Sequence, residues 1–283
     1  MAALPRGRRL PDLAVEMLAE FAGTLILILF GVGVVAQAVA ASGLGPPLSL
    51  GGHDAITWAW GWGVTLGVYV SARLSGGHIN PAVTISLAVF KGFPWRKVLP
   101  FIFAQMLGAF IAALIVRWDY SEILAKFDPG HTAKTQFVFS TMPGNGSLPI
   151  HTWGAFRDQI IGTAILLFLV LALTDARNSP PLANMAPLII GLVVVAIGMA
   201  FGSAAGYAIN PARDFGPRLA QYITGYDTAW RDQYGHFYFW VPLVAPIIGG
   251  ILGAGLYILL IGRNIPEEGP GGTEPRPEYD VEE

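Results

Sequence analysis

The stretch GYAINPARD at residues 206–214 decides the fold, together with an earlier counterpart, GHINPAVT at residues 77–84. Each contains Asn-Pro-Ala after a Gly-containing approach and before a short apolar run. Asn is a preferred helix N-cap and Pro is favoured in the first helical turn, so each triplet predicts the start of a helix. The apolar runs end near Phe90 and Tyr222, well short of the ~20 residues needed to cross a bilayer. One such triplet is ordinary capping, but two at matching places in two similar halves indicate a pair of half-helices.

Composition places the chain in a membrane. It has 283 residues, of which 53% are hydrophobic and only 13% charged, whereas a soluble domain carries about 25% charged residues. The apolar residues gather in long runs, which predicts an all-α membrane protein with six transmembrane helices and two re-entrant half-helices. The spans are 13–40, 55–73, 97–118, 158–174, 185–205 and 238–261, and the half-helices are 80–90 and 210–222. The chain has no Cys, which excludes disulfides and thiolate metal sites, and we expect no cofactor.

Two similar halves follow one another in the sequence. AEFAGT at residues 19–24 opens the first half, and QIIGT at residues 159–163 opens the second. Each half continues with another full span, an Asn-Pro-Ala half-helix and a third full span. Because each half has an odd number of full spans, the second enters the membrane from the opposite side, which predicts inverted repeats around a central pore. We expect a first repeat at 1–130, a second at 131–265 and a disordered cytosolic tail at 266–283.

The distribution of Lys and Arg predicts the orientation. With the amino end inside, the inner loops hold more of these residues, so we expect both termini in the cytoplasm and the protein in the plasma (inner) membrane. The inner residues are Arg6, Arg8, Arg9, Arg73, Lys91, Arg96, Lys97, Arg177, Arg263 and Arg276, and the outer ones are Arg117, Lys126, Lys134, Arg157, Arg218 and Arg231. A cleaved secretory signal is the alternative for the amino end, but its apolar run is too long and contains Glu16 and Glu20.

The half-helices then enter from opposite sides, and their amino ends meet near the midplane, where they concentrate positive dipole. Asn80 and Asn210 can each direct a side-chain N–H into this region. The stretches before them are expected to be non-helical and to expose carbonyls, which is tolerated at this depth only along a cavity or inside protein. The predicted pore-lining carbonyls belong to Gly76, Gly77, His78, Ile79, Ala204, Ala205 and Gly206. Such a pore suits a small neutral molecule with hydroxyl groups and repels cations, protons included.

These features resemble the major intrinsic protein (aquaporin) family over nearly the whole chain. The motif NPARDFGPR at residues 210–218 is similar to that of glycerol facilitators, in which Asp follows Arg as Asp214 does here. Tyr120, Pro242 and Leu243 also match that group. The resemblance implies a passive channel for glycerol and other small neutral solutes, which also passes water and excludes ions and protons. It further implies a right-handed bundle, a pore in each protomer and a homotetramer in the lipid bilayer.

The resemblance also implies roles for individual residues. It places the selectivity filter, the outer constriction, at Trp60, Gly198, Tyr207 and Arg213. Arg213 would donate hydrogen bonds to two neighbouring hydroxyls of the permeant, while Trp60 and Tyr207 cradle its carbon face. The alternatives are packing for the two aromatic residues and an outer headgroup anchor for Arg213. The central pore motif consists of Asn80, Pro81, Ala82, Asn210, Pro211 and Ala212, and the loop support consists of Glu20, Gln159 and Asp214.

Two positions depart from the family pattern. Tyr207 stands where glycerol facilitators commonly have Phe, which adds a hydroxyl group and narrows the filter slightly. Gln159 stands where the pattern has a second buried Glu to match Glu20. A Gln accepts a hydrogen bond through its carbonyl oxygen without a charge, so the sequence predicts that Gln159→Glu is tolerated. Ordinary helix packing is the alternative role for Gln159.

The sequence leaves two alternative functions. A water-selective channel is the nearest alternative, and Asp214 and Gly198 argue against it. An ion-coupled secondary transporter also uses inverted repeats, but Glu20 is the only carboxylate well inside a predicted span. An enzyme is not expected, because the sequence has no His-Glu-x-x-His and no Gly-x-Ser-x-Gly. We expect no nucleic-acid partner, since no basic cluster carries interleaved aromatics, and no metal site at His53, His131, His151 or His236.

Overall fold

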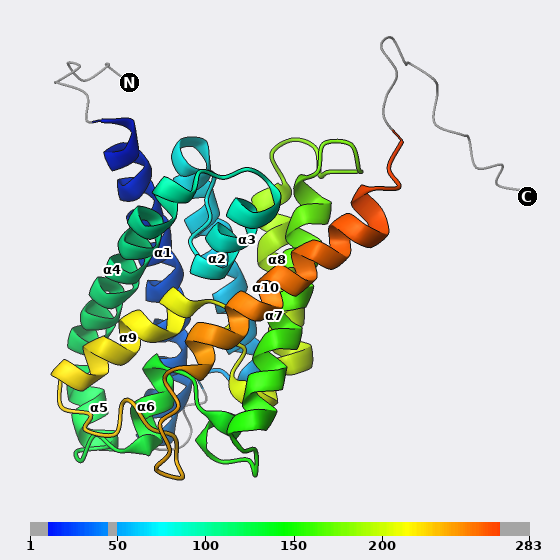
Figure 1. The fold of residues 1–283 in the computed structure, drawn as a ribbon. Helices are drawn as coiled ribbons and strands as arrows, with labels where there is room; N and C mark the ends of the chain where they lie inside the picture. The colour runs from blue at the N-terminus through cyan, green and yellow to red at the C-terminus, as the bar shows by residue number, and fades with distance from the viewer. Residues whose placement is uncertain (1–10, 45–49, 267–283) are drawn as a thin grey trace, which may run out of the picture.

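The computed structural model describes residues 11–44 and 50–266, and the regular structure of these segments is almost entirely helical (Figure 1). The long helices are α1 (Asp12–Val35), α2 (His53–Ser75), α4 (Trp95–Asp119), α7 (Thr152–Thr174), α8 (Ala186–Ala205) and α10 (Val241–Tyr257). The shorter helices are α3 (Pro81–Phe90), α5 (Ser121–Phe127), α6 (Ala133–Phe139) and α9 (Pro211–Ile223). The predicted all-α fold class is confirmed. The predicted disordered tail, 266–283, lies outside the described residues except for Pro266.

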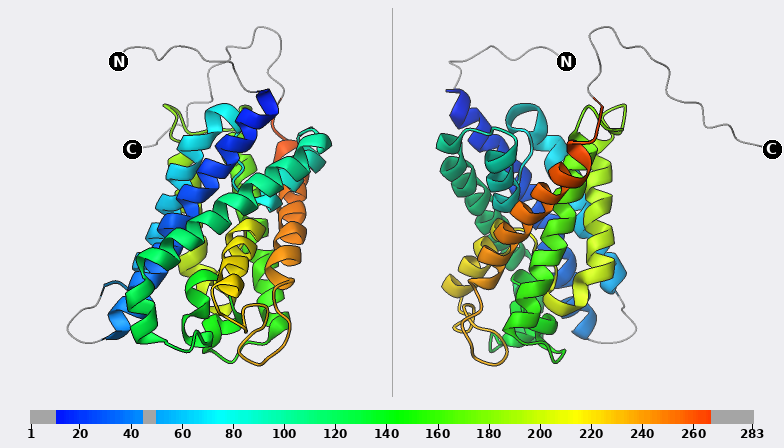
Figure 2. Two further views of the ribbon diagram at one scale, coloured as in Figure 1. Left: turned by 90° about the vertical axis from the view of Figure 1, so that its left-hand side faces the viewer. Right: turned by 45° about the vertical axis from the view of Figure 1, so that its right-hand side comes forward.

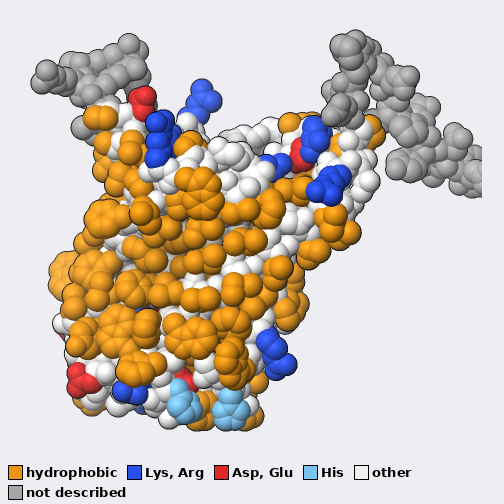
Figure 3. All heavy atoms as spheres, viewed as in Figure 1, with side chains coloured by type: hydrophobic (Ala, Val, Ile, Leu, Met, Phe, Trp, Pro, Cys, Tyr) orange, Lys and Arg blue, Asp and Glu red, His pale blue; other side chains and the backbone are white. Residues whose placement is uncertain are grey.

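Six long helices correspond to the six predicted spans. Within the described segments, five are long and apolar enough to cross a membrane: α1, α4, α7, α8 and α10, with α1 and α10 each extended by further helical turns. Helix α2 has 23 residues and packs against both α1 and α8. The ends of the six long helices differ from the ends of the predicted spans by a few residues. Helix α7, for example, begins at Thr152 rather than at residue 158. Figure 3 shows a face covered by hydrophobic side chains with charged ones near both ends, as expected of a protein embedded in a bilayer.

The two halves of the chain repeat the same packing. Helix α1 packs against α2 and α4, and α7 packs against α8 and α10 in the same order. Each half-helix packs against a long helix of the other half of the chain. Helix α3 of the first half contacts α10, and α9 of the second half contacts α4. Figures 1 and 2 show α3 and α9 in opposite halves of the molecule's height, among the long tilted helices. Each half-helix therefore completes the other half of the bundle.

Local sequence explains where the half-helices begin. Asn80 is the N-cap of α3, and its Oδ1 accepts a hydrogen bond from the N–H of Ala82 at 2.8 Å. Asn210 caps α9 in the same way, accepting from the N–H groups of Ala212 and Arg213 at 3.0 and 3.2 Å. A Pro follows each Asn and occupies the first turn. These caps pair N–H groups that a helix start otherwise leaves without a partner.

Sharp reversals separate each half-helix from the long helix before it. Helices α2 and α8 end at Gly76 and Gly206, whose φ values of 95° and 65° are left-handed and favour glycine. Ile79 and Ile209, which precede the Asn caps, have φ values of 42° and 43°. β-Branched residues rarely occupy this region, so the surrounding packing must hold them there.

Ala204 and Ala205 correct one expectation from the sequence. Both were predicted to belong to a non-helical approach, yet they lie in the last turn of α8. Ala is the best helix former, and the first residue here that favours a left-handed conformation is Gly206. The non-helical segment before Asn210, which we call the second approach, therefore consists of residues 206–209 and is shorter than predicted. The first approach is the corresponding segment before Asn80, residues 76–79.

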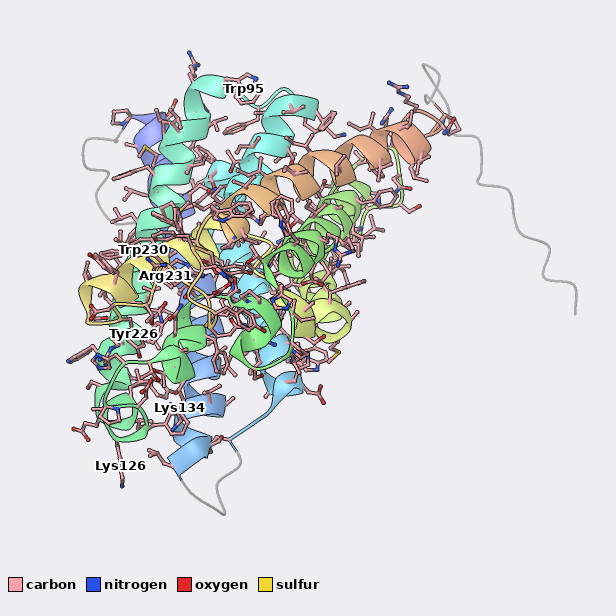
Figure 4. All side chains as sticks on the ribbon, turned by 60° about the horizontal axis from the view of Figure 1, so that its bottom comes forward. Trp95, Lys126, Lys134, Tyr226, Trp230 and Arg231 are labelled. Carbon is pink, nitrogen blue, oxygen red and sulfur yellow. The ribbon has the colours of Figure 1, made fainter. Side chains whose placement is uncertain are left out.

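The segment between α4 and α7 covers the end of the molecule that carries the start of α7. It contains α5 and α6, to which sequence reasoning assigned no helix. Figure 4 views this end, with Lys134 of α6 on the same side as Tyr226 and Arg231 of the connection after α9. The hydroxyl groups of Thr135 and Tyr226 lie 2.8 Å apart, and Gln136 Nε2 donates to the carbonyl of Arg231 at 2.8 Å. These contacts attach the segment to the half of the chain that contains α9.

Candidate functional site

A cavity of about 410 Å³ lies between the two halves. Its wall reaches from Trp60 and Arg213 to Thr174 and Asn184, near the opposite ends of the long helices. Of the predicted site residues, the wall includes Trp60, Gly76, Gly77, His78, Ile79, Asn80, Tyr207, Asn210 and Arg213. The remaining ones, Glu20, Pro81, Ala82, Gln159, Gly198, Ala204, Ala205, Gly206, Pro211, Ala212 and Asp214, lie outside this wall. Ala208 and Ile209 also line the cavity, and both belong to the stretch from Ala204 to Ile209 whose carbonyls were expected to be exposed.

The two Asn side chains are fixed across the junction of the half-helices. Asn80 Nδ2 donates to the carbonyl of Ile209 at 2.9 Å, and Asn210 Nδ2 donates to the carbonyl of Ile79 at 2.8 Å. The Oδ1 atom of each Asn is already engaged as a helix cap. An amide nitrogen carries two N–H groups, so each Asn keeps one for a molecule in the cavity. The arrangement offers two fixed donors where the amino ends of α3 and α9 meet.

Arg213 is held at one end of the cavity by its neighbours. Its guanidinium lies 4.1 Å from the centre of the Trp60 ring, and its Nη1 donates to the carbonyl of Phe139 at 3.3 Å. Arg213 is 6% exposed and Trp60 is 3% exposed. A guanidinium has five N–H donors, so groups remain that can face a solute. The site thus joins a fixed cation to an apolar ring face.

Tyr207 lies in the same region with its ring against Gly198. A Cβ atom added to Gly198 would come within 2.9 Å of Tyr207 Cζ, so the ring occupies space that only glycine leaves free. Tyr207 has a φ of 33°, an uncommon value for a bulky residue. The structure therefore brings Trp60, Tyr207 and Arg213 together at the cavity wall and places Gly198 behind the Tyr207 ring.

Some of the carbonyls expected to line the pore are engaged in hydrogen bonds within the protein. The carbonyl of Ala205 accepts a hydrogen bond from Gln159 Nε2 at 2.9 Å, outside the cavity wall. Those of Ile79 and Ile209 accept the bonds from the two Asn side chains. The approach at 76–78 and Ala208 supply the remaining backbone of the wall. The non-helical segments before Asn80 and Asn210 thus both contribute to the wall, and much of the rest consists of apolar residues such as Leu27, Val68, Leu87, Leu166 and Val194.

Glu20 lies behind the first approach and accepts four hydrogen bonds. Its Oε1 accepts from Ser75 Oγ at 2.6 Å and from the N–H of His78 at 2.9 Å. Its Oε2 accepts from the N–H of Ile79 and from Gln105 Nε2, both at 2.7 Å. Glu20 is fully buried, and hydrogen bonds of this kind stabilise a carboxylate strongly. Sequence analysis named Glu20 but had no signal for Ser75 or Gln105.

Gln159 lies behind the second approach and makes two hydrogen bonds. Its Oε1 accepts from the N–H of Ile209 at 2.9 Å, and its Nε2 donates to the carbonyl of Ala205 at 2.9 Å. Gln159 is fully buried. It therefore acts both as an acceptor and as a donor at the two ends of the second approach.

Asp214 joins α9 to the segment that carries Phe139. Its Oδ2 accepts from the N–H and the hydroxyl of Thr141 at 2.7 and 2.6 Å, and its Oδ1 accepts from Arg218 Nε at 2.7 Å. Asp214 and Arg218 are both fully buried. Sequence analysis named Asp214 alone, although the spacing of four residues would place Arg218 on the same helix face. Thr141 is a partner that only the folded chain brings near.

His78 is engaged within the protein. Its Nδ1 lies 3.1 Å from Thr84 Oγ1, and its ring packs against those of Phe93 and Phe101 at centroid distances of 4.7 and 5.2 Å. The Thr84 hydroxyl also contacts the carbonyl of Asn80 at 3.1 Å, which connects His78 to the start of α3. Within the described segments, no group of three His, Asp or Glu side chains is arranged to hold a metal ion.

Comparison with known proteins gives a consistent result. A family model described as major intrinsic protein matches residues 9–257. Aquaglyceroporin-2 of Rhizophagus irregularis is 43% identical over 251 residues, which cover 87% of this chain and 77% of that protein. The glycerol uptake facilitator protein of Haemophilus influenzae is 43% identical over 264 residues, which cover 90% of this chain and 97% of that protein.

A solved structure has the same fold. The X-ray structure of the aquaglyceroporin from Plasmodium falciparum matches with a TM-score of 0.78 and 32% sequence identity, covering 89% of this chain and 98% of that one. Some similar relatives are longer, and this chain spans 64% and 53% of the length of two of them.

Proposed function

This chain belongs to the major intrinsic protein family, and from this premise we propose that it is a passive transmembrane channel for glycerol and other small neutral solutes. It also passes water, and it excludes ions and protons. The family consists of channels and facilitators rather than enzymes. The similar proteins include an aquaglyceroporin and a glycerol uptake facilitator, and both names indicate the same class of permeant.

The cavity between the halves is the observation that carries this proposal. Its wall contains the non-helical segments before Asn80 and Asn210 and those two Asn residues, which we infer to form its polar side, and most of its other residues are apolar. Glycerol has hydroxyl groups along one edge and carbon–hydrogen groups along the other. A molecule of this kind can exchange its hydration for the polar side while its carbon edge contacts the apolar walls. No carboxylate belongs to the cavity wall within the described residues.

Charge exclusion follows from the amino ends of α3 and α9 and from Arg213. Both helix starts point positive dipole at the junction, and Arg213 adds a fixed cation at one end of the cavity. A cation that enters must lose its hydration and approach these positive groups, which is unfavourable in a medium of low dielectric. We assign the selectivity filter to Trp60, Tyr207 and Arg213. Gly198 belongs to it indirectly, because the absence of a side chain there leaves room for the Tyr207 ring.

The same premise supports the placement and assembly of the protein. We assign residues 1–130 and 131–265 to two inverted repeats, with both termini in the cytoplasm of a plasma (inner) membrane. We also infer a homotetramer with one pore in each protomer. Lys and Arg are more numerous in the loops that this orientation places inside, which supports it.

Stopped-flow light scattering on proteoliposomes tests the permeant. Vesicles with the protein should shrink under a glycerol gradient and refill with glycerol much faster than empty vesicles, and water flux should rise as well. Gly198→His is the matched variant, because a side chain there displaces the Tyr207 ring. It should lower glycerol flux more than water flux. Glycerol flux at the level of empty vesicles, with rapid water flux, would instead establish the water-selective alternative.

A second measurement separates a channel from a coupled transporter. Glycerol uptake should be linear in the gradient where a carrier saturates, and an imposed proton gradient should drive no accumulation. Uphill accumulation of glycerol under a proton gradient would contradict the channel and favour the transporter.

A further inference from the structure

Two buried sockets hold the two pore approaches, one in each half of the chain. We call the surroundings of Glu20 on α1 the first socket and those of Gln159 on α7 the second socket. Glu20 bonds the N–H of Ile79, and Gln159 bonds the N–H of Ile209. These two Ile residues precede the two Asn caps. The sockets are therefore counterparts, although one holds an acid and the other an amide.

The first socket is lined by donors. Two backbone N–H groups, the Ser75 hydroxyl and the Gln105 amide all donate to the two oxygens of Glu20. A carboxylate suits this arrangement because it only accepts. An amide in its place would turn an N–H group toward some of these donors.

The second socket lacks the matching side-chain donors. Ala205 takes the place of Ser75, since each is the last residue of its long helix before the Gly that ends it. Pro246 takes the place of Gln105: each lies three residues before a Gly, Gly108 or Gly249, whose backbone packs on the helix that carries the socket residue. Neither an Ala nor a Pro side chain can donate a hydrogen bond.

The orientation of the Gln159 amide follows from its partners. The N–H of Ile209 can only donate, so it faces Oε1, and the carbonyl of Ala205 can only accept, so it faces Nε2. Both bonds are 2.9 Å long. One side chain thus ties the end of α8 to the residue before the Asn210 cap. Tyr207 lies in the loop between these two points, and the Ile209 carbonyl holds Asn80.

We propose that Gln159 is a positioning residue that clamps the loop 206–209 through both its donor and its acceptor, in a socket built for a neutral amide. The acid of the first socket cannot replace it there, because an ionised carboxylate has no proton to give to the Ala205 carbonyl. This differs from the expectation drawn from sequence, which considered only the acceptor. The proposal rests on the proposed function in that the clamped loop carries Tyr207 of the filter.

Gln159→Glu tests the clamp through its dependence on pH. A protonated carboxyl group can donate to Ala205 and accept from Ile209, but the ionised form cannot donate. Glycerol flux of the variant should therefore fall as pH rises from 5 to 8, by roughly fivefold or more for one lost buried hydrogen bond. The parent should show no such fall, because its partners in the socket are backbone groups. The parent also controls for Asp158, the adjacent acid on α7.

Two further variants complete the test. Gln159→Met keeps the shape but removes both hydrogen bonds, so its flux should be low at every pH. Gln159→Glu combined with Ala205→Ser supplies the hydroxyl donor that Ser75 provides in the first socket, so flux at pH 8 should recover. Flux of Gln159→Glu equal to the parent's across this pH range would overturn the proposal, and so would parent-like flux of Gln159→Met.

Hydrogen exchange at the Ile209 amide gives a readout that does not depend on transport. Exchange should be faster in Gln159→Met than in the parent, and faster in Gln159→Glu at pH 8 after correction for the intrinsic rate. Equal protection in all three proteins would overturn the clamp. A parent that passes no glycerol would count against the proposed function, while these exchange rates would still decide the clamp.

Discussion

At the scale of single residues, glycines determine where the aromatic rings of the proposed filter lie. A Cβ atom added to Gly31 of α1 would overlap the ring of Trp60, whereas Gly33 of the same helix has no atom within 4 Å of such a Cβ. The ring also lies under the Arg213 guanidinium at 4.1 Å. Because Gly31 has no side chain, the Trp60 ring can pack directly against α1 at the wall of the cavity.

Gly31→Ala should narrow the cavity at Trp60. The added methyl group must displace the ring, and overpacking of this kind costs about 1–3 kcal/mol. We expect glycerol flux to fall by about tenfold, which corresponds to about 1.4 kcal/mol in the barrier, and water flux to fall less. Stopped-flow light scattering measures both. Gly33→Ala is the control and should leave both fluxes unchanged; equal fluxes for the two variants would show that Gly31 does not place the ring.

At the scale of elements, α9 uses one face to hold the segment at 139–141. Asp214 and Arg218 bond the N–H and the carbonyl of Thr141, and Ser140 Oγ donates to Gln221 Oε1 at 2.6 Å. The spacings of four and three residues place the three α9 side chains on one helix face. The carbonyl of Phe139, the first residue of that segment, accepts a hydrogen bond from Arg213 Nη1. Helix α9 thus supplies Arg213 of the proposed filter and also fixes one of its hydrogen-bond partners.

Arg218→Met should destabilise the protein strongly. It would leave the Asp214 carboxylate buried without its cation, which costs about 3–5 kcal/mol. Thermal unfolding in detergent should show a clear fall in the midpoint, and Asp214→Asn in addition should restore part of it. Arg231→Met, at an exposed residue on the same side of the protein, is the control and should change little. Equal midpoints for the two single variants would contradict the role given to Arg218.

At the scale of the whole molecule, Asp175 ties the carboxyl end of α7 to that of α10 and lies near the end of α3. Its side chain is 5% exposed and accepts from Arg177 Nε and Nη2 at 3.1 and 2.9 Å and from the Tyr257 hydroxyl at 3.1 Å. Lys91, directly after α3, lies 4.0 Å away. The Arg177 side chain holds the pKa of Asp175 well below its usual range, although burial opposes this shift. Its ionised form is therefore favoured in the folded protein.

A group with a lowered pKa stabilises the fold above its unfolded pKa, about 4 for Asp, and this contribution is lost as pH falls toward the folded value. Asp175→Asn should therefore lower the free energy of unfolding by about 1–3 kcal/mol at pH 7. The difference from the parent should shrink below about pH 4. Thermal unfolding midpoints at pH 7 and pH 3.5 measure this. Asp227→Asn, at an exposed residue in the connection after α9, should match the parent at both pH values. A pH-independent deficit in Asp175→Asn would contradict the charge-based account.

The sequence by itself determined the six long helices and the two half-helices, because their signals are local. Apolar runs of sufficient length predict the spans, and Asn followed by Pro predicts the starts of α3 and α9 within a residue. The local pattern missed the short helices α5 and α6, and it misplaced Ala204 and Ala205, where helix propensity continues α8 up to Gly206. The likeness of the two halves also indicated that the half-helices meet, which the packing of α3 on α10 and of α9 on α4 brings about.

Only the tertiary structure decided which groups complete the site. The Asn80 amide bonds a carbonyl 129 residues away, and Arg213 bonds one 74 residues away. No local pattern specifies such partners, because buried polar groups are paired by whatever donor or acceptor the packed chain brings to them. Gln159 shows the difference most clearly: in the sequence it is a weakened copy of Glu20, whereas in the fold Ala205 and Pro246 leave it neighbours that favour a neutral side chain able to donate as well as accept.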